Sequence, residues 1–304
     1  NEVDANSLSQ VEKMDRANSP EKFKIFQINL ASLSSSLLNA PSDISGEIST
    51  ITASFPNAEG KTSTFEIYKS QMMEAELLEA NPGIYNYTGI NKQDPTNTIK
   101  ISITPAFGMH VIGFDGSGST YYIDTYTSDF NSFIFYKRSD IQNNNSTFRC
   151  YVESPEEEII EDISTLDYQT LSIDNKFRTY RLAMACTIEY AAFHVNRAPA
   201  GVPRATEAQK KAIVLAAMNV TVNRLNAIYE RDLSIRFVLV ASNTNIIFVN
   251  SDNFNNNDAG VLIDQSQSVI TQIIGTANFD IGHTVSTGGG GLAGPSPCVS
   301  SRKA

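Results

Sequence analysis

The apolar residues of this chain repeat with one period in its first half and another in its second half. Between residues 47 and 138, short runs of β-branched and aromatic residues alternate with clusters of Gly, Ser, Asp and Pro, a pattern typical of antiparallel strands. The first two runs, 48–55 and 62–68, flank a turn containing Gly60 and predict a β-hairpin. Further strands are expected at 97–105, 109–116, 119–126 and 132–138. Within this region, only residues 71–79 predict a helix.

From residue 177 on, strand-like and helix-like patterns alternate. Residues 177–190 predict a strand, because apolar side chains occupy every second position. Thr206 and Gln209 form a capping-box pattern that predicts a long helix ending near Glu230. Strands are expected next at 234–240 and 245–249, then a helix that starts around Asp264 and Gln267 and stops at Gly275, then a last strand. This order predicts an α/β layer, so the whole chain is expected to have an α+β fold, antiparallel first and α/β second.

One face of the long helix is predicted to be core. Apolar residues recur there at helical spacing: Val214, Met218, Val222, Leu225 and Tyr229. We interpret this stripe as a surface that packs against a sheet rather than as a ligand site.

A strongly acidic segment separates the two halves. Residues 153–174 carry eight carboxylates and no basic residue, and their mutual repulsion disfavours compaction. We therefore predict a polar arm at 1–46 that could dock a short strand, a β-rich domain at 47–152, an acidic linker at 153–176 and an α/β subdomain at 177–304. The alternative is that the acidic residues form a solvated surface segment of one larger domain.

Composition narrows the class of protein. A formal net charge of -10 and a pI near 4.8 argue against a nucleic-acid partner, and no apolar run approaches the roughly 18 residues of a membrane span. The sequence starts at Asn1, which fits a secreted protein without its signal peptide, although a cytosolic fragment would look the same. Cys150, Cys186 and Cys298 cannot all pair within the chain, so at least one is free, metal-directed or bonded elsewhere.

The usual hydrolytic motifs are absent from the sequence. His110, His194 and His283 are far apart, so the i, i+4 histidine pair of a local zinc site does not occur. A G-x-S-x-G nucleophile elbow is also missing. The glycine run 288–291 lacks the spacing of a phosphate-binding loop and instead indicates a flexible or closely approached backbone.

Two further candidates have competing interpretations. Asp252 and Asp258 could belong to a calcium loop, but Phe254 stands where an oxygen ligand would be needed, so turn formation and helix capping are the favoured roles. Cys150 is either a small buried hydrophobe or disulfide half, or a thiolate that reaches a metal from a detachable domain.

Three segments, 180–190, 222–240 and 279–292, resemble the first half of the catalytic domain in secreted bacterial zinc peptidases of the reprolysin (adamalysin-like) branch of the metzincins. More weakly, residues 71–90 and 119–127 resemble the propeptide of the same enzymes. The resemblance implies a twisted sheet with helices, whose edge strand binds extended substrate by adding the peptide as a further strand.

The resemblance also assigns roles to residues near the end of the sequence. Residues 280–287 resemble the strand that precedes the edge. The candidate substrate-binding residues of the edge itself are Gly290, Gly291, Leu292, Ala293 and Gly294. Cys298 matches a cysteine that pairs with the other half of the catalytic domain, and Cys150 could act as a latency thiol, although no P-R-C-G-type motif surrounds it.

In that family, the next segment is the helix H-E-x-x-H-x-x-G-x-x-H, which supplies three zinc-binding His and a general base. It does not occur in these 304 residues. The expectation is therefore the proregion and N-terminal catalytic subdomain of a secreted zinc metalloendopeptidase, truncated before its zinc helix and inactive alone. Zinc would bind in the full-length enzyme, and the partners would be a protein or peptide substrate and the chain's own C-terminal catalytic half. The alternatives are a non-enzymatic secreted peptide-binding protein and a β-rich adhesion module.

Overall fold

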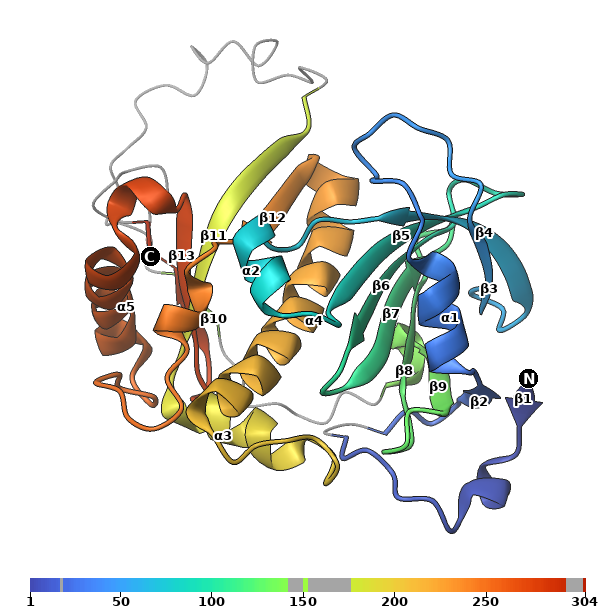
Figure 1. Cartoon of the computed structure of the whole chain (residues 1–304), viewed down its shortest axis with the longest axis horizontal. Coiled ribbons are helices and arrows are strands. Elements are labelled where there is room, and N and C mark those ends of the chain that lie inside the picture. Colours follow the sequence, from blue (N-terminus) through green and yellow to red (C-terminus); the bar gives the residue numbers. More distant parts are fainter. Residues whose placement is uncertain (17–18, 142–149, 153–175, 294–302) are drawn as a thin grey trace.

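The computed structural model describes residues 1–16, 19–141, 150–152, 176–293 and 303–304. Its elements lie in layers (Figure 1). Helix α5 (Ala259–Ile274) covers a small sheet, α4 (Glu207–Leu233) follows, then comes a large sheet, and α1 (Leu30–Leu37) covers its far face. This mixture of a large antiparallel sheet with helices and a second sheet confirms the α+β class.

The large sheet has nine antiparallel strands in the order β1-β2-β9-β8-β7-β6-β5-β4-β3. Their bounds are Glu2–Val3 (β1), Lys24–Gln27 (β2), Thr52–Pro56 (β3), Thr62–Lys69 (β4), Tyr85–Asn91 (β5), Thr98–Thr104 (β6), Gly108–Phe114 (β7), Thr120–Thr125 (β8) and Ser132–Lys137 (β9). The predicted hairpin and the four further strands of this region are confirmed, and α2 (Ala75–Ala80) confirms its helix. Residues 1–46 contribute β1, the short helix η1 (Ala5–Leu8), β2 and α1.

The two faces of the large sheet differ in polarity, because side chains alternate along each strand. The face toward α1 is apolar and fully buried, with Phe65, Tyr87, Ile101, Tyr121 and Phe133 in one core with Leu37 of α1. The opposite face carries polar and charged side chains: Asn86, Thr88, Lys100, Ser102, His110 and Asp124. It is this polar face that lies against α4.

The small sheet is parallel, with β11 (Arg178–Cys186) in the centre between β12 (Ile235–Leu239) and β13 (Ile281–Val285). Helices α3 (Ile188–Arg197) and α4 connect β11 to β12, and α5 connects β12 to β13. The first connection leads from β11 to β12 on one side of it, and the second leads from β12 back across to β13 on the other side. The carboxyl end of β11 is therefore the topological switch point of the sheet.

Three predicted boundaries in this part are wrong. The strand expected over 177–190 ends at Cys186, because the Thr187 side chain accepts the Tyr190 N–H and caps α3. Residues 245–249 do not form a strand; the helix η4 (Asn243–Ile246) and a single bridge from Ile247 to Cys186 stand there instead. Helix α5 starts at Ala259 rather than near Asp264.

Helix α4 has 27 residues and is buried on two sides. For this reason one half of its circumference is not exposed and polar, as it would be in a surface helix. The capping box of Thr206 and Gln209 is confirmed. So is the apolar stripe: Val214, Met218 and Val222 are buried, and Leu225 and Tyr229 pack against the same core. The second face of α4, which contacts the large sheet, was not predicted.

A separate two-stranded sheet joins distant parts of the sequence. Strand β10 (Cys150–Val152) runs parallel to β14 (Gly291–Ala293), with Cys150 opposite Gly291 and Val152 opposite Ala293. Among the residues that the structure describes, no helix is long and apolar enough to cross a membrane.

Candidate functional site

The candidate edge strand lies just beyond β13. Gly291, Leu292 and Ala293 form β14, and Gly290 precedes it with a φ of 104°, a conformation that glycine adopts most readily. In the described part of the chain β14 pairs with β10 and does not join the β12-β11-β13 sheet. Gly294 lies outside the described residues, so its place in the edge stays a prediction.

The ends of β11 and β13 are tied together by one amide. Asn256 Oδ1 accepts hydrogen bonds from Thr187 Oγ1 at 2.9 Å and from Thr287 N at 3.0 Å. Thr187 directly follows β11, and Thr287 follows β13 by two residues. Asn256 thereby fixes where the chain leaves the sheet and turns toward β14. Sequence reasoning did not single out this residue, and its only signal was an asparagine-rich loop.

The same loop explains the first glycine of the run 288–291. A Cβ atom on Gly288 would lie 2.1 Å from Asn256 O, so only glycine lets the two backbones approach this closely. The prediction of a closely approached backbone is confirmed at this position.

The two aspartates of the loop have structural roles. Asp252 accepts the Ile188 N–H at 2.6 Å at the start of α3, and the Phe254 N–H at 2.9 Å. Asp258 is the N-cap of α5 and accepts the N–H groups of Gly260 and Val261. Turn formation and helix capping, the favoured interpretation, are confirmed.

The three histidines lie apart from one another. His110 Nδ1 is 2.7 Å from Asp124 Oδ1 on the large sheet, and His283 is on β13. His194 packs among aromatic rings, 4.5 Å from Tyr190 and 6.1 Å from Phe107 between centroids; burial, and then the charge of Arg197, lowers its pKa to about 4. Over the described ranges, no three His, Cys, Asp or Glu side chains come together as a metal site would require. The described residues therefore do not form the ligand set of a catalytic zinc ion.

Among the cysteines, only Cys186 has a described side chain. It is free and fully buried, and burial raises the pKa of its thiol to about 12, so it is a structural residue and a poor nucleophile. The backbone of Cys150 lies in β10, and Cys298 lies outside the described residues. The latency and disulfide roles of these two cysteines therefore stay predictions.

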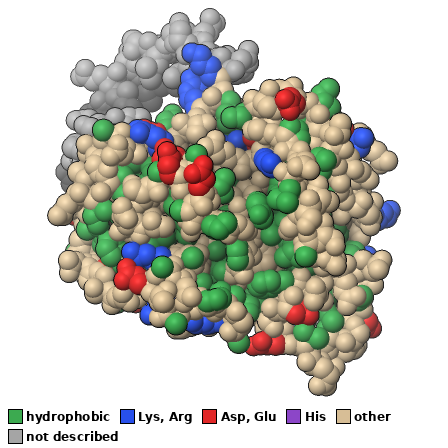
Figure 2. Space-filling view, in the orientation of Figure 1, with side chains coloured by type: hydrophobic (Ala, Val, Ile, Leu, Met, Phe, Trp, Pro, Cys, Tyr) green, Lys and Arg blue, Asp and Glu red, His purple; other side chains and the backbone are tan. Residues whose placement is uncertain are grey.

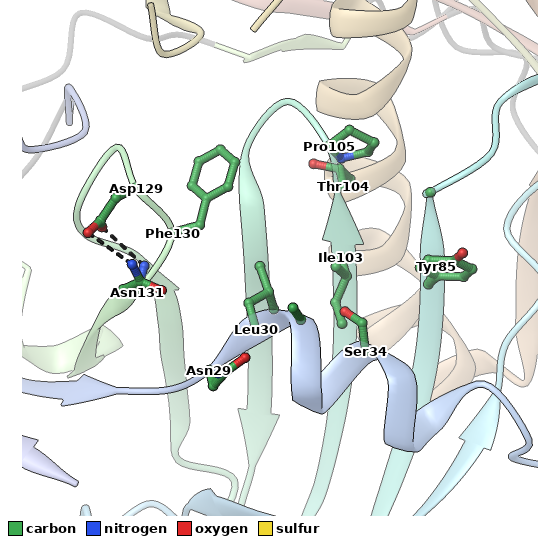
Figure 3. A pocket seen from close by; sticks show the side chains of 12 residues that line it. Asn29, Leu30, Ser34, Tyr85, Ile103, Thr104, Pro105, Asp129, Phe130 and Asn131 are labelled. Atoms are coloured by element: carbon green, nitrogen blue, oxygen red, sulfur yellow. Dashed lines mark hydrogen bonds between the residues drawn. The ribbon is translucent and has the colours of Figure 1, made fainter. Parts of the chain in front are cut away.

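A cavity of about 370 Å³ lies elsewhere, between α1 and the ends of β5 and β6 (Figure 3). Leu30, Ile103 and Phe130 supply its apolar walls. Two of its polar side chains already have hydrogen-bond partners: Asn29 caps α1, and Asp129 accepts from Asn131 at 3.0 Å.

The visible surface carries no concentrated basic patch. Figure 2 shows Lys and Arg dispersed among acidic, apolar and uncharged side chains on this face. On this face, the distribution agrees with the negative net charge of the chain.

Comparison with known proteins finds a family likeness in the C-terminal part of the chain. No curated protein matches the sequence. Residues 215–304 match the family model for reprolysin-like metallopeptidases of family M12B. This range begins within α4 and includes β12, α5, β13 and β14. The members of this family are metallopeptidases, a class of enzyme that uses zinc to act on protein or peptide substrates. From residue 215 on, the chain is therefore similar to the reprolysin-like metallopeptidases of family M12B.

Proposed function

We propose that this chain is the proregion and the N-terminal catalytic subdomain of a secreted zinc metalloendopeptidase. In this proposal β14 is the strand that aligns the extended substrate, and the zinc helix belongs to sequence outside these 304 residues. The family match over residues 215–304 is the observation that carries the proposal, because it includes β14 and the elements that position it.

The pairing of β10 with β14 supports a precursor state. β10 precedes the acidic segment, so it belongs to the half that resembles a propeptide, and it occupies a backbone edge of β14. An extended peptide would use the same kind of edge, since main-chain hydrogen bonds supply affinity in strand addition. We therefore propose that β10 keeps the candidate edge covered in the precursor.

The residues of this chain would position the substrate and leave the chemistry to the missing helix. Asn256 holds the ends of β11 and β13 together, and the close approach of Gly288 fixes the turn into β14. In the complete enzyme, bound zinc would activate the attacking water. These 304 residues contain no H-E-x-x-H segment, so in this proposal the metal ligands and the general base lie in sequence outside them.

The test is production of the longer protein from the same gene. The proposal predicts one zinc ion per chain by elemental analysis, and cleavage of a protein substrate that a chelator abolishes and added zinc restores. The matched control is the 304-residue chain alone, for which we predict no stoichiometric zinc and no cleavage. A longer protein without bound zinc and without cleavage would refute the proposal.

A further inference from the structure

We propose that residues 1–152 stay bound to residues 176–304 as a non-covalent subunit after the chain is cut in the acidic segment. On the first part, the contact surface consists of the polar face of the large sheet and of residues 72–74. On the second part, it consists of α4 and β12. This inference does not depend on catalytic activity, because it concerns the contact between the two parts.

The two parts share backbone pairing. Leu239 N donates to Met72 O at 3.0 Å, and Glu74 N donates to Leu239 O at 2.9 Å, so the segment around Met73 extends the small sheet beyond β12. The Glu74 carboxylate also accepts the Ala241 N–H at 2.7 Å. These bonds join the first part to an edge of the second part that would otherwise be unpaired.

The two parts also share one apolar core. Met72, Met73, Leu77, Ile84 and Phe107 of the first part belong to the same buried cluster as residues of α3, α4 and the small sheet. Met72, Met73 and Leu77 are each no more than 2% exposed. Separation would bring this apolar surface into water, which is unfavourable.

Buried amides connect the large sheet with the second face of α4. Asn86 and Asn219 exchange two hydrogen bonds, of 2.8 and 3.0 Å. One turn further along α4, Asn223 Nδ2 donates to Ser102 Oγ at 2.8 Å. All four side chains are buried, so separation would take the described partners from Asn219 and Asn223. Asn86 and Ser102 would keep only the 2.9 Å bond between Ser102 Oγ and Asn86 Oδ1.

A four-charge cluster crosses the interface near the end of α4. Lys100 of the large sheet lies 2.6 Å from Glu230, and Arg236 bridges Glu230 at 2.7 Å and Asp43 at 2.6 Å. Asp43 and Lys100 come from the first part, and Glu230 and Arg236 from the second. Each part thus contributes one positive and one negative charge, so removal of either part would leave an opposite-charge network incomplete.

A second cluster is centred on Asp124. Arg224 of α4 forms an ion pair with this carboxylate, His110 lies 2.7 Å and Arg16 3.6 Å from it, and the Tyr136 hydroxyl donates to it at 2.6 Å. Burial raises the pKa of Asp124, but Arg224, His110 and Arg16 outweigh burial and hold it well below its usual range. Asp124 is therefore ionised at neutral pH, and Arg224 adds an ion-pair partner from the second part.

These contacts combine strand pairing, apolar burial and complementary buried charge, which are the features of a stable interface between subunits. Strand β10 precedes the acidic segment in the sequence, so it stays with the first part. A cut between residues 153 and 174 is therefore expected to leave both parts, and the pairing of β10 with β14, in place.

The test uses the 304-residue chain with a site-specific protease sequence inserted between residues 153 and 174. After complete cleavage, size-exclusion chromatography at micromolar concentration is expected to give one peak that contains both pieces, with circular dichroism unchanged. Elution of the pieces in separate peaks, or precipitation of one while the other stays in solution, would overturn the proposal.

Variants show whether the described contacts hold the cleaved pieces together. Arg236→Met leaves Asp43 and Glu230 without their shared partner and is expected to raise the dissociation constant roughly a hundredfold or more. Lys92→Met is the control, because Lys92 pairs with Glu66 within the first part, and it is expected to leave the constant unchanged.

A milder substitution covers the case in which Arg236→Met fails to fold. Arg231→Gln removes a cation–π contact in which the guanidinium lies 4.1 Å from the centre of the Phe114 ring, and is expected to weaken the complex by about two- to fivefold. If neither folded interface variant shifted the constant relative to Lys92→Met, the proposed surface would be wrong.

Discussion

Replacement of Asn219 by Ala should destabilise the chain strongly, although the Asn219 side chain is uncharged. Asn219 is fully buried, and its side-chain amide exchanges two hydrogen bonds with Asn86, of 2.8 and 3.0 Å. Loss of two hydrogen bonds costs about 2 kcal/mol, and a further ~1 kcal/mol or more comes from Asn86 Nδ2, which stays buried without this acceptor. The expected fall in the free energy of unfolding is therefore about 3 kcal/mol.

A double-mutant cycle separates this pair from general effects of truncation. Asn86→Ala, Asn219→Ala and the double variant are compared by urea unfolding followed by circular dichroism. We expect a coupling energy of at least about 2 kcal/mol, because the double variant loses the same two hydrogen bonds only once and leaves neither amide unpaired. Thr221 is exposed on the same helix and bonds Ala217 O, so a cycle of Thr221→Ala with Asn86→Ala should be additive. A coupling below about 0.5 kcal/mol for the Asn pair would refute the docking of the large sheet on α4 in this register.

Three further predictions concern single residues. Because burial lowers the pKa of His194 to about 4 from its ordinary 6.5, the folded chain binds fewer protons than the unfolded chain between these values, and stability must fall as the pH drops through this window. His194→Phe should therefore reduce the loss of unfolding free energy between pH 7 and pH 5 by about 2 kcal/mol, and an unchanged pH dependence would contradict the burial. A Cβ on Gly113 would lie 2.2 Å from the buried Tyr121 ring, so Gly113→Ala should lower the free energy of unfolding in urea by about 2 kcal/mol. Gly201→Ala, whose Cβ would meet nothing within 4 Å, should be nearly neutral. Cys186, with a pKa of about 12, should resist iodoacetamide at pH 8 in the folded chain and react in urea, as peptide mass mapping would show; rapid labelling of the folded chain would contradict its burial.

Much of the fold could be predicted from local pattern. The strands of the large sheet and the long helix stand out because their hydrophobic periods differ, and the capping box of Thr206 and Gln209 marks where α4 begins. Helix α3 was missed because residues 188–190 continue the apolar pattern of β11. What ends the strand is the hydrogen bond from the Tyr190 N–H to Thr187 Oγ1, which the pattern does not reveal.

The contact between the two halves could not be predicted from the apolar stripe alone. Asn219, Asn223 and Glu230 recur on α4 at spacings that place them on one face, yet a polar helix face normally indicates solvent. Only the fold shows that this face meets Asn86, Ser102 and Lys100 on the large sheet. Polar residues at helical spacing opposite an apolar stripe are therefore a signal for a second packed face when the helix is long.

The candidate site was recognisable in part. The glycine run and the strand before it pointed to an edge, and Gly288 shows why a glycine is needed there. The role of Asn256 depends on bringing residues 187 and 287 together, and the partner of β14 depends on a segment about 140 residues earlier in the sequence. Contacts of such separation leave no local trace in the sequence.

The coding sequence that follows codon 304 tests the proposed function most directly. The proposal predicts that the same reading frame continues into an H-E-x-x-H-x-x-G-x-x-H segment, which would supply three zinc ligands and the general base. A stop codon at that point, or a continuing frame without this segment, would contradict the assignment of β14 to the substrate side of a zinc peptidase.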